Sequence, residues 1–173
     1  ILSQYANMGL LGITLPEKYG GAGLTAFDAV LAIEELARVS PIAAMPVFET
    51  SVGPVRVVDL FGTEDQKKRF IPPSCNGKRL MAVAMTEPEA GTALTDLTTR
   101  AVLKGDHYVI NGRKRFISGG GHSDFYMVYI RLSEAKGAKG IGGIVVEKDS
   151  LGFTFGKQEA FMGLHGMPSC DLI

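Results

Sequence analysis

The spacing of apolar residues changes near residue 80. Residues 1 to about 75 place apolar side chains at helical spacing, interrupted by a loop at 15–23 that holds one proline and three glycines. From Leu80 onward, short runs of β-branched and aromatic residues alternate with polar turns, which is typical of strands. Because helices and strands are segregated, a doubly wound parallel sheet is excluded. The pattern predicts an α+β chain: a partial N-terminal α-helical domain at 1–78, then an antiparallel β-barrel or sandwich domain at 79–173.

The helical part is predicted to hold several helices. Residues 2–8 read as a helix end, and Thr25 is a good N-cap for a helix that ends at Ser40, because the residue before Pro41 avoids helical angles. That helix should bury one apolar stripe. The residues of the stripe are Phe27, Val30, Leu31, Leu36 and Ala37.

Two further helices follow. One is predicted from about Pro46 to Leu60, weakened by Gly53 and Pro54. The other opens at Thr63 with a capping box and is expected to stop at Pro72-Pro73. Ser74 to Gly77 then reads as the linker to the β domain.

Strands are predicted from Leu80 onward. The expected ranges are 80–85, 97–103, 107–110, 114–118, 125–131 and 141–147. Lys104-Gly105-Asp106 reads as a tight turn. Asn111-Gly112 is the strongest hairpin signal, since a type I′ turn needs positive φ at both central residues, and it predicts that 107–110 and 114–118 pair antiparallel.

Composition excludes several classes of partner. Eighteen basic and eighteen acidic side chains balance, so the chain has no electrostatic case for binding nucleic acid or an anionic membrane. No apolar stretch approaches the roughly 18 residues of a membrane span, so no membrane insertion is expected.

Cys75 and Cys170 lack metal spacing and read as reduced thiols rather than a disulfide. None of the three histidines has a ligand partner at metal spacing, so no metal site is expected. The chain begins without an initiator Met or a signal peptide, and both ends read as cuts through a longer protein.

Two short segments carry candidate chemistry. Thr86-Glu87-Pro88 ends an apolar strand, where a hydroxyl and free backbone groups could pair with the polar edge of a heteroaromatic ring. A plain proline turn explains the same residues. Phe116 and Ser118 stand two apart on a predicted strand, so the ring and the hydroxyl share one face and could hold a flat cofactor. A core Phe beside a sheet-edge Ser is the alternative.

In combination, five segments resemble the acyl-CoA dehydrogenase family over nearly the whole chain. The glycine-rich opening at 9–21 is similar to the family's G-L-x-G-x-x-x-P-x-x-Y-G-G, and 61–67 is similar to F-G-T-E-x-Q-K. The segment 81–91 resembles the flavin-binding T-E-P-x-A-G-S-D, and 111–118 resembles the segment that ends in W-I-T. The segment 162–166 follows in family order.

The resemblance implies FAD as cofactor and assigns positions to it. Val83, Met85 and Thr86 would contact the pyrimidine edge of the flavin, and Gly91 and Thr92 would lie near the cofactor, with Thr92 also near the substrate's pantetheine. Phe116 would stand where the family usually has Trp, beside Ile117. Ser118 would replace the usual Thr whose hydroxyl reaches flavin N5. Thr92-Ala93 replaces the common Ser-Asp, so this chain departs from the family at three places.

The resemblance also implies a reaction and partners. The family carries out α,β-dehydrogenation of an acyl-CoA thioester: a carboxylate removes the α-proton, a hydride passes from the β-carbon to flavin N5, and an electron-transfer flavoprotein receives the electrons. The family's base lies in a C-terminal helical domain that residues 1–173 do not include, so no catalytic residue is assigned and the isolated fragment is expected to be inactive. A homodimer or homotetramer is implied, in a bacterial cytoplasm, which is favoured, or in the mitochondrial matrix.

Other readings stay open from the sequence. A same-fold acyl-CoA oxidase, flavin monooxygenase or CoA-ester lyase-type relative would keep the fold and change the chemistry. A non-catalytic flavin- or CoA-binding module is a further alternative. Lys136 and Lys139, in the polar loop at 133–140, could face CoA phosphates or simply be solvated.

Overall fold

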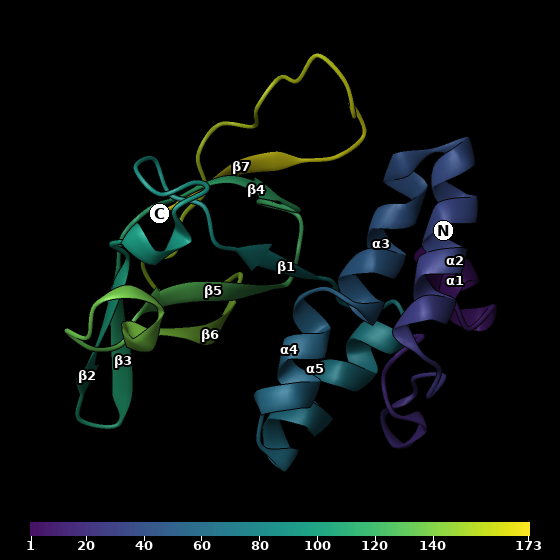
Figure 1. Ribbon diagram of the computed structural model, residues 1–173, viewed down its shortest axis with the longest axis horizontal. Coiled ribbons are helices and arrows are strands. Elements are labelled where there is room, and N and C mark those ends of the chain that lie inside the picture. The colour runs from purple at the N-terminus through teal and green to yellow at the C-terminus, as the bar shows by residue number, and fades with distance from the viewer. The chain divides into compact units, whose positions relative to one another are not determined.

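The computed structural model describes all 173 residues. It divides into two compact units, Ile1–Met81 and Ala82–Ile173. Helices make up the first unit and strands the second, as Figure 1 shows. The predicted α+β class, with a helical part preceding a β domain, is confirmed.

Five α-helices build the first unit. They are α1 (Leu2–Asn7), α2 (Ala26–Val39), α3 (Pro41–Ser51), α4 (Pro54–Phe61) and α5 (Glu64–Cys75), with a 3₁₀ turn at Glu17–Tyr19. Both predicted N-caps are confirmed: the hydroxyls of Thr25 and Thr63 accept from the backbone N–H of Asp28 and Gln66, whose side chains accept in return from the cap residues' own N–H groups. These reciprocal bonds satisfy donors that a helix start leaves free.

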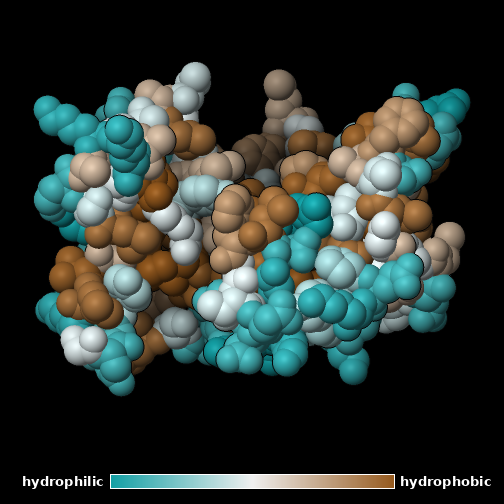
Figure 2. Space-filling model, turned by 60° about the horizontal axis from the view of Figure 1, so that its bottom comes forward, coloured by the Kyte–Doolittle hydropathy of each residue, from teal (hydrophilic) through white to brown (hydrophobic).

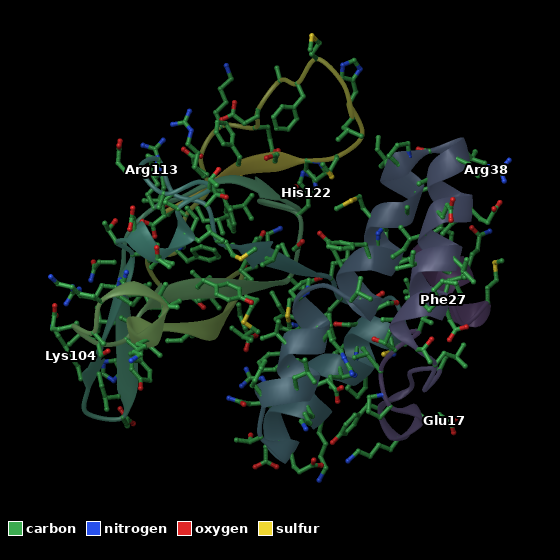
Figure 3. All side chains as sticks on the ribbon, viewed as in Figure 1. Glu17, Phe27, Arg38, Lys104, Arg113 and His122 are labelled. Carbon is green, nitrogen blue, oxygen red and sulfur yellow. The ribbon has the colours of Figure 1, made fainter.

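Helix α2 buries a stripe that overlaps only partly with the predicted one, since Leu36 belongs to both. Ala29, Ile33 and Leu36 face the core of this unit with Val47 of α3. Phe27 is 69% exposed (Figure 3), and Val30 and Leu31 are also exposed. The helix carries two neighbouring apolar stripes, and the periodicity alone does not tell which of them packs against α3.

Prolines begin helices in this unit and are tolerated within them. The single helix predicted at 46–60 is wrong: α3 ends at Ser51, and Pro54 opens α4 after Gly53, whose backbone is not helical. The predicted stop at Pro72-Pro73 is also wrong, because α5 continues to Cys75. A proline removes only its own N–H, and the Ser74 hydroxyl, which donates to the Phe70 carbonyl at 3.0 Å, occupies an acceptor in the last turn.

Seven strands build the second unit. They are β1 (Met81–Ala84), β2 (Arg100–Lys104), β3 (His107–Asn111), β4 (Lys114–Ser118), β5 (Phe125–Arg131), β6 (Ile141–Glu147) and β7 (Ser169–Leu172). Five strands form one sheet in the order β1-β5-β2-β3, with β6 paired to β5, and β4 pairs with β7 in a second sheet. The sheets are open rather than closed into a barrel, and the contact of β2 with β5 is parallel.

The two sheets share one apolar core. Ala82, Ala84 and Tyr126 of the large sheet meet Ile117 and Cys170 of the small sheet, and Phe153 and Phe155 pack against them. Tyr126 contacts both phenyl rings, with centroids at 5.2 and 5.7 Å. Cys75 and Cys170 are free and buried. Hydrophobic residues also remain at the surface, where Figure 2 shows them as brown patches between hydrophilic ones.

The predicted hairpin at Asn111-Gly112 is wrong. Strand β3 pairs with β2 around the Gly105 turn, with Lys104 opposite His107, whereas β4 pairs with β7. Of the two residues only Gly112 has a positive φ. A Cβ on Gly112 would stand 2.7 Å from the Thr99 Cα. Glycine is therefore required at this position because a neighbouring backbone approaches closely, and not to form a type I′ turn.

Candidate functional site

A β-bulge in β4 shapes the site. Lys114 pairs with Leu172 and Ile117 pairs with Cys170, so two residues of β4, Arg115 and Phe116, oppose a single residue of β7. The backbone φ of Phe116 is 56°, in the left-handed region that residues other than glycine rarely adopt. The residue is 49% exposed. The bulge therefore directs a large aromatic ring outward, while Lys114 before it and Ile117 after it stay buried.

Phe116 and Ser118 line one hollow of about 330 Å³. The rest of its lining comes from the segment before β7 and the first residue of that strand: Phe161, Met162, Gly163, Leu164, Met167 and Ser169. This segment is the long yellow loop in Figure 1. The volume lies at the lower end of the range of ligand pockets, about 300–1,000 Å³, and suits part of a larger ligand. The prediction that ring and hydroxyl share one face is met.

The end of β1 lies beside this bulge. The Thr86 carbonyl accepts from the Arg115 N–H at 2.8 Å, and the Met85 carbonyl accepts from Lys114 Nζ at 2.9 Å. Val83, Met85 and Thr86 are half-buried. The structure thus brings the predicted Thr86 segment next to the predicted aromatic position, although the two are thirty residues apart in sequence.

A buried ion pair, which the sequence did not indicate, lies beneath these segments. Lys114 Nζ lies 2.9 Å from Glu87 Oε1, and the two side chains are 2% and 3% exposed. Burial raises the pKa of Glu87, but hydrogen bonds from Lys114, Thr98 and Thr99 outweigh it and lower that pKa to about 2. Burial lowers the pKa of Lys114, and the charged Glu87 opposes this effect. A Glu and a Lys 27 residues apart carry no local signal that would predict the pair.

Gly91 and Thr92 occupy an exposed loop outside the hollow. Arg131 connects the end of this loop to the lysine-bearing loop: its guanidinium donates to the carbonyls of Leu97 at 3.2 Å and Gly137 at 2.7 Å, and also to that of Thr95. Lys136 and Lys139 are exposed beside it.

The side chain of Ile117 does not face the hollow. It is 3% exposed and packs in the shared core with Ala82 and Cys170. Only the backbone of Ile117 is therefore available to a ligand. Its position in the bulged strand, between two hollow-lining residues, follows from the alternation of strand side chains.

Other candidate chemistry is sparse. No three His, Cys, Asp or Glu side chains are grouped as a metal site. His122, after β4, is exposed, and Arg113 lies just before that strand (Figure 3). Arg113 pairs with Asp171 of β7. No helix is long and apolar enough to cross a membrane.

The site fits a planar heteroaromatic group with a polar edge. Phe116 offers a half-exposed ring for stacking, with the Arg115 guanidinium 4.7 Å from its centroid, and the methionines of the hollow offer soft apolar contacts. The hydroxyls of Ser118 and Thr86 take part in no hydrogen bond within the protein, so both are available to a ligand. Each can donate or accept, as ring nitrogens and carbonyls require.

Comparison with known proteins identifies the family. The chain matches the family descriptions "Acyl-CoA dehydrogenase, N-terminal domain" over residues 1–78 and "Acyl-CoA dehydrogenase, middle domain" over residues 82–173. The mitochondrial isobutyryl-CoA dehydrogenase of Dictyostelium discoideum is 39% identical over 175 residues, which span 100% of this chain and 41% of that protein.

Solved structures agree. A chain in the structure of the electron transferring flavoprotein of Acidaminococcus fermentans has a TM-score of 0.93 at 37% identity, covering 99% of this chain and 45% of that chain. An acyl-CoA dehydrogenase complexed with FAD from Bacillus anthracis has a TM-score of 0.86 at 33% identity, covering 99% and 29%. The chain spans less than half the length of these three relatives. Sequence and fold together place this chain in the acyl-CoA dehydrogenase family.

Proposed function

We propose that the whole protein is an FAD-dependent acyl-CoA dehydrogenase that desaturates the α,β-bond of an acyl-CoA thioester. The observation that carries the proposal is the hollow lined by Phe116 and Ser118, with Thr86 anchored beside it. Membership of the family supports FAD as the ligand of this hollow. When bound, FAD accepts the hydride that leaves the β-carbon of the substrate.

The residues of this chain bind and orient the cofactor in this proposal. Phe116 would stack against the flavin ring, the Ser118 hydroxyl would donate toward N5, and Val83, Met85 and Thr86 would face the pyrimidine edge. The carbonyls of Met85 and Thr86 each accept one hydrogen bond, from Lys114 and Arg115. Each carbonyl oxygen has a second lone pair, and the Thr86 hydroxyl can donate or accept, so these are the polar groups that the segment can offer a ligand.

The acyl-CoA side of the site is proposed around Thr92. Gly91 and Thr92 lie in the exposed loop that Arg131 ties to the Lys136 loop, and this arrangement supports contacts with the pantetheine and phosphates of CoA. Arg131 thus forms hydrogen bonds to both loops. The positive charges of the exposed Lys136 and Lys139 would attract the phosphates of CoA.

No residue within 1–173 is assigned as the catalytic base. Glu87 is held by Lys114 and three donors from Thr98 and Thr99, and Glu49 is buried in the helical unit. A base must reach the α-carbon of the substrate with a free carboxylate. The base, the electron-transfer flavoprotein partner, the homo-oligomer and the cytoplasmic location all belong to the proposal for the whole protein.

The test is an anaerobic titration of the whole protein with a panel of acyl-CoA thioesters, followed by flavin absorbance. Bleaching by one class of thioester is the expected result and names the substrate class. A bound flavin that no thioester reduces would contradict dehydrogenation. Rapid reoxidation of the reduced flavin by oxygen would instead favour the oxidase alternative.

A further inference from the structure

The ion pair beneath the hollow does more than stabilise the fold. Taking two charges out of water costs about as much as their attraction returns, so a buried pair adds little stability over apolar residues of the same size. Its distinct contribution is to fix geometry, because both ends are held by directional hydrogen bonds. The positions that it fixes here are those of the proposed flavin contacts.

Glu87 closes the loop that follows β1. Its Oε2 accepts from the N–H of Thr98 at 2.6 Å and from the Thr98 hydroxyl at 2.9 Å, and its Oε1 accepts from the N–H of Thr99 at 2.9 Å. One carboxylate thereby joins the start of the loop at residue 87 to its end at 98–99. The segment with Gly91 and Thr92 is contained between these two points.

Lys114 connects this closed loop to the bulged strand. Its ammonium group donates to Glu87 and to the Met85 carbonyl, both at 2.9 Å. The next residue, Arg115, donates its N–H to the Thr86 carbonyl. The segment on which Thr86 lies is therefore held to β4 at two consecutive residues.

The same lysine anchors one side of the bulge. Phe116, with its φ of 56°, lies between the buried Lys114 and the buried Ile117. A residue other than glycine keeps such a backbone conformation only when the surrounding structure holds it there. Ile117 is held by the core, and Lys114 by its ion pair, so the direction of the Phe116 ring depends on both anchors.

We propose that Lys114 and Glu87 are positioning residues of the flavin site: as a pair they hold Thr86 and Phe116 at a fixed distance and orientation for the flavin ring. This inference rests on the proposed function, since it assigns a role within the same site. Neither residue touches the flavin; both act through Met85, Thr86 and Phe116. Loss of the pair loosens the site even when the fold persists.

The test compares two double variants of the whole protein. Lys114→Met with Glu87→Met removes both charges and all the hydrogen bonds of the pair, whereas Lys114→Gln with Glu87→Gln removes the charges and keeps a donor and an acceptor. We expect the Met pair to weaken FAD binding by roughly 10–100-fold, with an altered visible circular dichroism of the residual bound flavin. The Gln pair should recover most of that loss. A surface pair, Arg100→Met with Glu134→Met, is the control for removing two opposite charges from this unit.

The dissociation constant of FAD, measured by fluorescence on apoprotein with Tm followed in parallel, decides the outcome. Wild-type affinity and wild-type flavin circular dichroism in the Met pair would overturn the inference, and so would equal losses in the Met and Gln pairs. If the Met pair does not fold, Thr98→Val removes one hydrogen bond to Glu87 without leaving a charge unpaired, and we expect about fivefold weaker FAD binding. Unchanged affinity in that variant overturns the inference. A wild-type protein that binds no FAD contradicts the proposed function instead.

Discussion

Single residues show two different uses of burial. Ile117 and Ser118 are neighbours on β4, yet one packs in the core and the other lines the hollow. Glu49 of α3 is only 8% exposed, and desolvation raises its pKa from 4.5 to about 8. Within β4, burial of Ile117 therefore contributes to stability, whereas Ser118, which lines the hollow, is available for binding. Burial of Glu49 makes the stability of the protein depend on pH.

Ile117 and Ser118 should therefore respond in opposite ways to substitution. Ile117→Val is expected to cost about 0.5–1.5 kcal/mol of unfolding free energy and to change FAD affinity less than Ser118→Ala does, because a β-branched side chain still fills the core position. Ser118→Ala should leave stability within about 0.5 kcal/mol of wild type and weaken FAD binding. Chemical denaturation and flavin titration of the whole protein measure both. A larger loss of FAD affinity in Ile117→Val than in Ser118→Ala would show that the assignment of the two faces is wrong.

Glu49 should make the helical unit less stable as pH rises. The folded state binds the proton of Glu49 more tightly than the unfolded state does, so this contribution is complete below pH 4.5 and is lost as pH rises through about 8. Glu49→Gln lacks the titrating proton. Its stability relative to wild type should increase by up to about 1.4 kcal/mol per pH unit within that window.

Denaturant unfolding at a series of pH values checks this expectation. Glu34→Gln, at an exposed position of α2, is the control for removing one carboxylate. A stability difference between Glu49→Gln and wild type that stays constant over the same pH range would contradict the raised pKa.

Individual elements show which structural signals are local. The caps at Thr25 and Thr63 were predictable because donor and acceptor lie three residues apart. The pairing of β4 with β7 was not, because its partner lies some fifty residues away and Asn111-Gly112 imitates a hairpin. Phe116 and Ser118 were predictable as a pair, since alternation along a strand is local. The bulge and the ion pair beneath them depend on tertiary contacts that no sequence period encodes.

The bulge at Phe116 should lower the stability of the protein while it favours FAD binding. A non-glycine residue in the left-handed region is strained by about 1–2 kcal/mol, and asparagine tolerates that region better than other residues. We therefore expect Phe116→Asn to be more stable than Phe116→Ala, since both lose the ring and only Asn relieves the backbone. Both variants should bind FAD more weakly than wild type. Thermal unfolding and FAD titration test this, and equal stability of the two variants would argue against strain at Phe116.

At the scale of the whole molecule, all the residues proposed for the cofactor lie in one of the two units, Ala82–Ile173. The β unit supplies the hollow, the Thr86 segment and the buried pair. The helical unit supplies none of the residues assigned to the cofactor. The chain spans 41% of the Dictyostelium isobutyryl-CoA dehydrogenase, so more than half of such a protein lies outside the residues described.

A polypeptide limited to residues 1–173 should therefore fold yet fail to retain FAD. The hollow of about 330 Å³ is open and covers only part of a dinucleotide, because the ring contacts come from one strand and one loop. A ligand held on one face keeps most of its water contacts and dissociates quickly. The test is gel filtration of the polypeptide after incubation with FAD, with absorbance followed at flavin wavelengths. Circular dichroism checks that the polypeptide is folded, and the whole protein is the control. Stoichiometric flavin in the polypeptide peak would mean that residues 1–173 hold the cofactor by themselves, and it would contradict this expectation.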